Sequence, residues 1–211
     1  GGADSLDAAR KVFGDLDQLH SKLEAYVKRI KPPPSDLSTA SGSEAGGPIR
    51  KLSNAETLAR MGDFSVIRGN FEDAQNKLEE ALKADPSLAV AEQSMGFLFL
   101  QQNQLDDAEK HFARALELDA NDALTYYGQG FVAMTRGGHV GVPMSAVAAF
   151  EKAVALNPDI APAWSSLASI YALRAETMQK ALADARRAVS LAPGDARYQL
   201  QAAAILERIN E

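Results

Sequence analysis

The sequence predicts an all-α protein built as a solenoid of repeated helix hairpins. The stretch from Gly69 to Pro86 predicts an amphipathic helix, because its apolar residues lie three or four positions apart and therefore share one face. These residues are Phe71, Ala74, Leu78 and Ala81. The same pattern returns after 34 residues, and a fixed period of about 20 to 50 residues is typical of a solenoid.

Small residues at equivalent positions establish this period, pairing Ala74 with Ala108, Ala81 with Ala115, and Gly62 with Gly96 and Gly130. Each period predicts a first helix, A, and a second helix, B. The expected A helices cover residues 54–67, 88–101, 122–136 and 160–174, and the expected B helices cover residues 71–84, 105–118, 144–156 and 177–191. A last helix, which Asp195 would cap, is expected to end near Asn210.

The sequence also predicts the ends of the helices and the positions of the insertions. Asn70 can cap the first B helix with its side-chain oxygen, and Pro86 cannot extend it. Extra residues near 137–143 lengthen the third repeat, and one extra residue between Tyr171 and Ala181 lengthens the fourth. Insertions in solenoids map to loops, so we expect both in the turn between an A helix and its B helix.

These positions resemble the tetratricopeptide repeat family, in which glycine, alanine, aromatic and proline residues recur about every 34 residues. The resemblance covers residues 54–211, with repeats at about 55–88, 89–122, 123–160 and 161–195 and a capping helix at 196–210. It implies a right-handed α-solenoid that binds other proteins. We therefore expect a TPR domain over residues 49–211.

The first 48 residues are expected to lie outside the repeats. Residues 1–31 predict a helical segment, whose apolar stripe is Leu16, Leu19, Leu23, Tyr26 or Val27, and Ile30. Residues 32–48 are rich in Pro, Ser and Gly and predict a flexible linker. Residues 5–31 also resemble the C-terminal end of a peptidase-MA-like zinc peptidase domain, as found before such repeats in some bacterial proteins. That resemblance implies that the chain is an accessory, substrate-positioning part of a larger peptidase.

Composition narrows the classes of function. The 211 residues carry a net charge of −6, which disfavours nucleic acid as a partner because nucleic-acid-binding surfaces are basic. There is no cysteine, and His20, His111 and His139 have no second ligand at a metal-binding spacing. No catalytic motif and no apolar run of membrane-spanning length is present. We therefore expect no catalysis by this chain, no cofactor, no metal and no membrane insertion, and the sequence points to no compartment.

The inner face of the A helices is the expected binding site, because the resemblance implies that these positions line a concave groove. The residues expected to contact a partner are Asp63, Val66, Val90, Gln93, Phe97, Leu100, Gln101, Tyr127, Phe131, Met134, Ser165 and Ser169. The middle of this set is apolar and aromatic. It lacks the Lys, Asn and Arg residues with which some family members clamp the C-terminal carboxylates of a chaperone.

Three functions follow as hypotheses. The first is a non-catalytic scaffold whose groove binds an apolar peptide or helix, either from another protein or from residues 16–30 of this chain. The second is the accessory part of a bacterial zinc peptidase, which an upstream His-Glu-x-x-His segment would favour. The third is a surface for homo-oligomerisation.

Limited proteolysis tests the predicted division of the chain. We expect the first cleavages between Pro32 and Pro48, because this stretch has almost no apolar anchor. Mass spectrometry of the early fragments would locate the cuts. First cleavages inside the repeats, with residues 32–48 protected, would contradict the predicted boundary.

Overall fold

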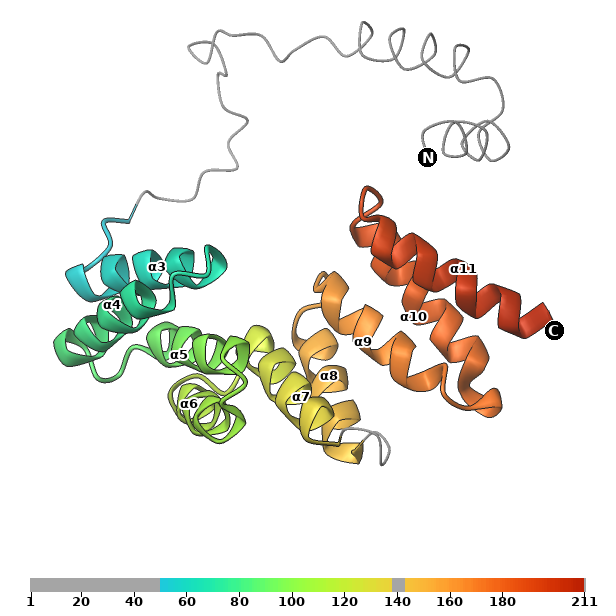
Figure 1. Ribbon diagram of the computed structural model, residues 1–211, viewed down its shortest axis with the longest axis horizontal. Helices are drawn as coiled ribbons and strands as arrows, with labels where there is room; N and C mark the ends of the chain where they lie inside the picture. Colours follow the sequence, from blue (N-terminus) through green and yellow to red (C-terminus); the bar gives the residue numbers. More distant parts are fainter. Residues whose placement is uncertain (1–49, 138–142, 211) are drawn as a thin grey trace, which may run out of the picture. The chain divides into compact units, whose positions relative to one another are not determined.

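The computed structural model describes residues 50–137 and 143–210 (Figure 1). Every regular element in this part of the chain is a helix, and the residues from Lys51 onward form one compact unit. The expected N-terminal helical segment, the linker and the peptidase-like stretch lie outside the described residues. The same is true of residues 138–142, where the longer insertion was expected.

Four helix hairpins and a final helix make up the described part of the chain. The A helices are α3 (Asn54–Ile67), α5 (Ala89–Gln101), α7 (Ala123–Gly137) and α9 (Ala161–Tyr171). The B helices are α4 (Phe71–Ala84), α6 (Leu105–Leu118), α8 (Met144–Leu156) and α10 (Met178–Leu191), and α11 (Ala196–Asn210) follows them. The all-α prediction is confirmed, and the helix ends agree with the predicted ones to about one residue except at the end of α9.

Helix α9 ends at Tyr171, whereas the sequence predicted a helix to residue 174. A short 3₁₀ helix, η2 (Ala175–Thr177), follows instead. The Thr177 hydroxyl donates a hydrogen bond to the carbonyl oxygen of Tyr171 at 2.6 Å, and this bond replaces one that a further helical turn would have made. The extra residue of the fourth repeat falls in this turn, which is why the period overestimated the length of the helix.

Local interactions define the start of the first helix, and residues with positive φ define the turns of the first two hairpins. At the start of α3, the Ser53 hydroxyl accepts from the Glu56 amide at 3.1 Å, and the Glu56 carboxylate accepts from the Ser53 amide at 2.8 Å. Gly69 and Asn103, which are 34 positions apart, are the described residues with positive φ, at 73° and 59°. Glycine and asparagine adopt this conformation at the lowest cost, so the first two hairpins turn in the same way.

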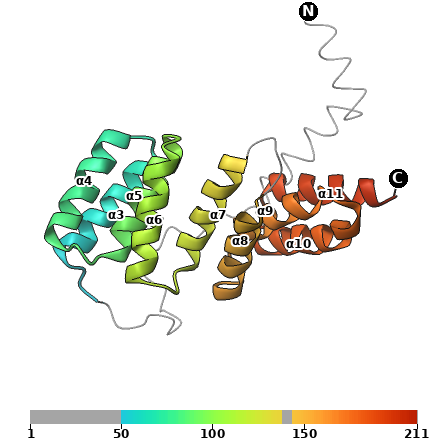
Figure 2. The ribbon, with the colours of Figure 1, turned by 90° about the horizontal axis from the view of Figure 1, so that it is seen from below.

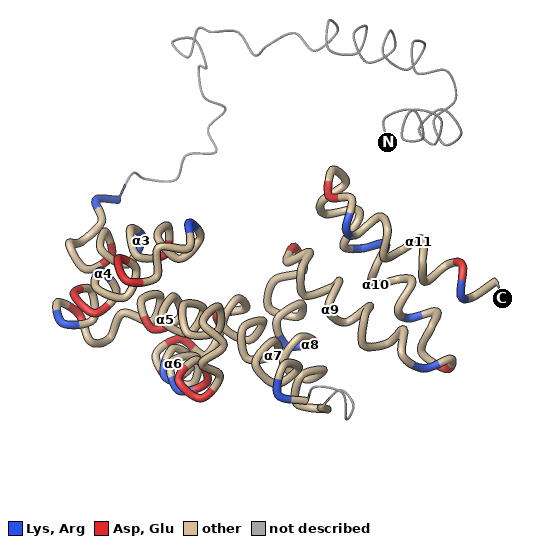
Figure 3. The backbone as a smooth tube through the Cα atoms, in the orientation of Figure 1, with Lys and Arg blue, Asp and Glu red and all other residues tan. Residues whose placement is uncertain are grey.

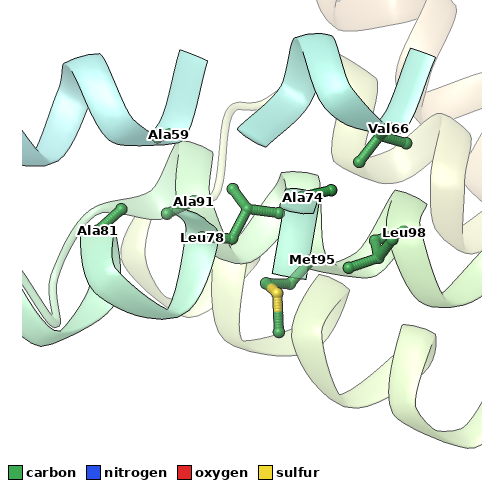
Figure 4. Packing of buried hydrophobic residues seen from close by; sticks show 8 residues of the cluster. All are labelled: Ala59, Val66, Ala74, Leu78, Ala81, Ala91, Met95 and Leu98. Carbon is green, nitrogen blue, oxygen red and sulfur yellow. The ribbon is translucent and has the colours of Figure 1, made fainter. Parts of the chain in front are cut away.

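Each B helix packs between its own A helix and the helix that follows it in the chain (Figure 2). Helix α4 contacts α3 and α5, and the relation repeats for α6, α8 and α10, the last of which contacts α9 and α11. Figure 4 shows the first such joint, whose buried residues are Ala59, Val66, Ala74, Leu78, Ala81, Ala91, Met95 and Leu98. Because half of these residues are alanines, the helix axes can approach closely, and this cluster joins the first repeat to the second.

A glycine on the A helix faces a bulky side chain on the B helix in three repeats. The fully buried ring of Phe112 lies between Gly96 of α5 and Gly128 of α7. A β-carbon placed on Gly96 would lie 2.5 Å from Phe112 Cδ1, and one on Gly128 would lie 2.4 Å from Phe112 Cζ. No side chain larger than hydrogen fits at either position unless the ring moves, so these two glycines determine how closely α5 and α7 approach α6.

Asp184 is a buried carboxylate on α10. Its residue is only 7% exposed, and its Oδ2 atom has no hydrogen-bond partner among the described residues. Burial raises the pKa of Asp184 to about 6, with Lys180 opposing the shift and Glu151 adding to it. The folded protein therefore keeps a proton on Asp184 at pH values where the unfolded chain has already released it.

Replacing Gly96 by alanine tests the close approach at Phe112. In an ordinary helix interior this change stabilises by roughly 0.5–1 kcal/mol. Here we expect a loss of about 1–3 kcal/mol in unfolding free energy, because the added methyl group overpacks the core. Urea denaturation would measure the change. Gly194→Ala is the control, since a β-carbon there meets nothing within 4 Å. A Gly96→Ala variant as stable as the parent would contradict the packing.

Replacing Asp184 by asparagine tests the buried carboxylate. A carboxyl group whose pKa is raised on folding costs stability as pH rises from about 4, where the unfolded chain ionises, to about 6, where the folded protein does. We therefore expect Asp184→Asn to melt higher than the parent above pH 6 and to differ from it least near pH 4. Thermal melts across this range, with the exposed Asp159→Asn as control, would measure the difference. A difference that does not change with pH would show that Asp184 is not the titrating group.

Candidate protein-binding surface

Some neighbouring helices of the array contact each other in addition to the contacts within and between hairpins. Helix α3 contacts α5, α5 contacts α7, and α9 contacts the final helix α11. The A helices after α3 are nearly uncharged, since α5, α7 and α9 together contain only Glu92 and Arg136 as charged residues. The B helices α4 and α6 are rich in charged side chains instead (Figure 3). A surface formed by the A helices would therefore bind mainly through apolar contacts.

The predicted contact residues of α5 and α7 include three large aromatic side chains, all half-buried. The Phe97 ring lies edge-on to Phe112, with ring centroids 5.0 Å apart and an interplanar angle of 76°. The Tyr127 ring contacts Phe131 at 6.2 Å and Phe150 at 5.8 Å. These aromatic rings therefore pack on the core with part of their surface and leave the rest accessible.

The neighbouring predicted residues Leu100 and Met134 share this environment. Both are half-buried, Leu100 against the cluster around Phe112 and Met134 against the cluster around Phe150. Thus Phe97, Leu100, Tyr127, Phe131 and Met134 are half-buried apolar residues on two helices that contact each other. We call these five residues the aromatic surface.

Tyr127 is the titratable group of the aromatic surface. Burial raises the pKa of its phenol, Tyr198 adds to the shift, and the charge of Arg197 opposes it. Arg197 and Tyr198 belong to α11, so the C-terminal helix contributes to the electrostatic environment of Tyr127. The phenol is neutral at physiological pH and can donate or accept a hydrogen bond.

Two polar residues of the predicted groove, Gln93 and Asp63, form hydrogen bonds with the next A helix. The Gln93 amide donates to Thr125 Oγ1 at 3.1 Å and also to Asp122, which in turn accepts from the Thr125 amide at 3.0 Å. Asp63 of α3 accepts a longer bond, 3.5 Å, from the Ser94 hydroxyl of α5. These side chains join successive A helices, so they are less available to a partner than the sequence alone suggests.

The two predicted serines lie against the C-terminal helix. The Ser165 hydroxyl donates to Gln201 Oε1 at 2.7 Å, and the Gln201 amide donates to Ser169 Oγ at 2.7 Å and to the Ser165 carbonyl at 2.9 Å. Helix α11 therefore uses the polar positions of α9 for its own attachment. Arg208 adds a bond from its guanidinium to the Ala172 carbonyl at 2.9 Å.

The remaining predicted residues differ in accessibility. Val66 is only 3% exposed and belongs to the first core cluster, so we remove it from the expected contact residues. Val90 is half-buried against the same cluster, and Gln101 is exposed at the end of α5. Because each turn of an A helix also faces a neighbouring repeat, pattern positions alone did not separate buried from accessible residues.

An exposed apolar face on α3 was not predicted from the sequence. Leu52, Met61 and Phe64 line a hollow of about 540 Å³ at the N-terminal end of the described repeats, with Arg60 and Arg68 beside them. The guanidinium of Arg68 lies 5.7 Å from the centre of the Phe64 ring. The signal that could have revealed this face is that α3 carries apolar residues where later A helices are covered by a preceding B helix.

His111, one of the histidines considered as a metal ligand, contacts the side chains of Glu92 and Phe99. Its Nδ1 atom lies 2.6 Å from Glu92 Oε2, and its ring stacks on Phe99 with centroids 5.2 Å apart. Among the described residues, no group of three or more His, Cys, Asp and Glu side chains could hold a metal ion. Within the same part of the chain, no helix is both long enough and apolar enough to cross a bilayer.

Comparisons with known proteins agree on the repeat type. Family models described as tetratricopeptide repeat match residues 66–127 and residues 141–196. The tetratricopeptide repeat-containing protein trd-1 of Caenorhabditis elegans is 28% identical over 132 residues, an alignment that covers 58% of this chain and 17% of that protein. The chain therefore spans about one sixth of the length of this relative.

Solved structures share the fold. The structure of pilF from Pseudomonas aeruginosa matches with a TM-score of 0.64 and 20% identity, covering 74% of this chain and 68% of that one. A thermophilic TPR protein of Thermus thermophilus matches with a TM-score of 0.60 and 19% identity, covering 73% and 82%. The matches to the family models over residues 66–127 and 141–196 show that the chain belongs to the tetratricopeptide repeat family.

Proposed function

We propose that this chain is a non-catalytic scaffold that binds an apolar peptide or helix of a partner protein on the aromatic surface of α5 and α7. Tetratricopeptide repeats support a role in protein interaction in general. The observation that carries the finer proposal is the set of half-buried aromatic rings on two adjacent helices that carry only Glu92 and Arg136 as charges.

The aromatic surface has the composition of an interface core. Large aromatic side chains held in place by their own packing are the usual anchors of protein interfaces, because they bury much area at little entropic cost. Phe97 and Tyr127 are held by Phe112 and Phe150 respectively, so little ordering would be needed on binding. Exposed polar residues at the helix ends, Gln101 and Thr135, would supply the rim of such a contact.

The scarcity of cationic residues on the A helices α5, α7 and α9 favours one ligand chemistry. No Lys or Arg occurs in α5 or α9, and the one in α7, Arg136, pairs with Asp106 and Glu109 of α6. A ligand recognised through its carboxylates would require such cations. An amphipathic helix or an extended segment with apolar residues at alternate or helical spacing fits the surface better.

A binding experiment tests the proposal. Peptides selected from a displayed library on the full chain would be titrated against the parent and Phe131→Ala by calorimetry. We expect the variant to lose about 2 kcal/mol or more, which is roughly a thirtyfold or larger increase in Kd. Circular dichroism would confirm that the variant is folded, and Phe131→Leu would serve if it is not.

The matched control is Met144→Ala. Met144 is a large apolar residue that is 79% exposed, but it begins the B helix α8 and does not belong to the aromatic surface. Its replacement should leave Kd within about twofold, since surface changes away from a contact have small effects. Binding that survives Phe131→Ala but weakens with Met144→Ala would place the interaction on the B helices and contradict the proposal.

A further inference from the structure

The exposed face of α3 has the composition of a joint between repeats. Met61 and Phe64 on this face are 48% and 58% exposed. In α5, α7, α9 and α11, the residue equivalent to Phe64 is buried in a cluster with the preceding B helix. These buried residues are Leu98, Val132, Ile170 and Ile205. Among the described residues, the face of α3 therefore lacks the neighbour that its equivalents have.

Helix α11 is equivalent to an A helix, and it exposes the opposite side. Ile205 of α11 is buried against α10, just as Ile170 of α9 is buried against α8. In the first hairpin, the side of the A helix that faces its own B helix is buried at Ala59, Gly62 and Val66. The equivalent residues of α11 are exposed, and they are Leu200, Ala203 and Glu207. Together with Ala196, which lies one turn before Leu200 and is also exposed, we call these residues the α11 stripe.

The two exposed surfaces are complementary in shape. In the first three hairpins, a large side chain of one helix packs against a small residue of its neighbour. Large side chains border the hollow of about 540 Å³ on α3, namely Leu52, Met61 and Phe64. On the α11 stripe, Leu200 is 71% exposed and Ala203 leaves room beside it. Leu200 can therefore enter the hollow while Phe64 lies over Ala203, which repeats the contact that closes each hairpin.

The charges of the two surfaces are also complementary. The ionised groups that border the hollow are mainly cations, namely Arg60, Arg68 and Lys77, with the carboxylate of Asp73 paired to Lys77. The charged residue of the α11 stripe is Glu207, whereas Arg197 beside the stripe pairs with Asp195, and Arg208 bonds to the Ala172 carbonyl oxygen. Two α3 faces in contact would bring like charges together, whereas the α11 stripe places a carboxylate opposite the cations.

We propose that this chain assembles head to tail, with the α3 face of one copy packed on the α11 stripe of a second copy. Because the contact joins two different surfaces, every dimer keeps one free surface of each kind, and the assembly grows further or closes into a ring. The aromatic surface of α5 and α7 takes no part in this contact. An assembly would therefore present that surface several times, which strengthens binding to a partner with repeated segments.

Sedimentation equilibrium of the full chain at increasing concentration tests the assembly. A contact between single helices is expected to bury less than about 1,200 Å², which is typical of weak association, so the measurement must extend to about 1 mM. We expect the average mass of the parent to rise past that of a dimer. Phe64→Gln and Leu200→Gln should each associate at least about tenfold more weakly, because each removes an apolar anchor without adding a charge.

The matched control is Met144→Gln, which changes an apolar residue of α8 that is 79% exposed and lies outside both surfaces. It should assemble like the parent, and circular dichroism would establish that all three variants are folded. Assembly lost in Met144→Gln as well would show that general surface hydrophobicity drives the association, which contradicts the proposal.

A mixture of the two weakened variants separates a head-to-tail contact from every other contact. Phe64→Gln keeps an intact α11 stripe and Leu200→Gln keeps an intact α3 face, so an equimolar mixture should form dimers that grow no further. Assembly of either variant alone at the strength of the parent would exclude its altered surface from the contact and overturn the proposal. A mixture that stays monomeric, or a parent that stays monomeric at every concentration, would overturn it too.

Discussion

Contact between a small residue on each A helix and the side chain that faces it on the B helix is the constraint on which the solenoid depends. Gly62 faces Leu78, Gly96 faces Phe112 and Gly130 faces Phe150. The missing β-carbon lets a large apolar side chain lie directly against the A-helix backbone, which brings the two helices close and buries the ring completely. Phe112 also contacts Gly128 of the following A helix, so the same ring that closes one hairpin positions the next. The contact within a hairpin recurs in the first three described hairpins, and the one between Phe112 and Gly128 joins the second hairpin to the third.

In the fourth repeat, two alanines take the places of the glycine and of the large side chain that faces it. Ala168 and Ala185 are both small and both buried, and Met178, Leu182 and Ile205 complete their cluster. Ile205 belongs to α11, so the last hairpin relies on the C-terminal helix for part of its core. Gln201 of α11 also bonds to polar atoms of α9, and Arg208 bonds to the carbonyl oxygen of Ala172, the residue that follows α9. The capping helix is therefore a structural part of the final repeat.

In the middle of the array, the side chains that we propose as partner contacts also pack on the core. The charged residues are concentrated on α4 and α6, and the A helices α5, α7 and α9 are almost free of charge. Phe97 and Tyr127 each contact a buried ring of a B helix while keeping part of their own surface accessible. A partner that covers them would extend an existing core.

The sequence by itself determined the all-α class, the number of hairpins and nearly every helix end, because the repeat period, the apolar spacing and the capping residues are local properties of the chain. Only the tertiary structure decided which groove positions are accessible. Val66 is buried, and Gln93, Ser165 and Ser169 bond to neighbouring helices, since each position of a repeat also faces another repeat. The exposure of Met61 and Phe64 has the same physical origin. The period assigns a residue its place within a repeat, but burial depends on whether another helix packs against that place.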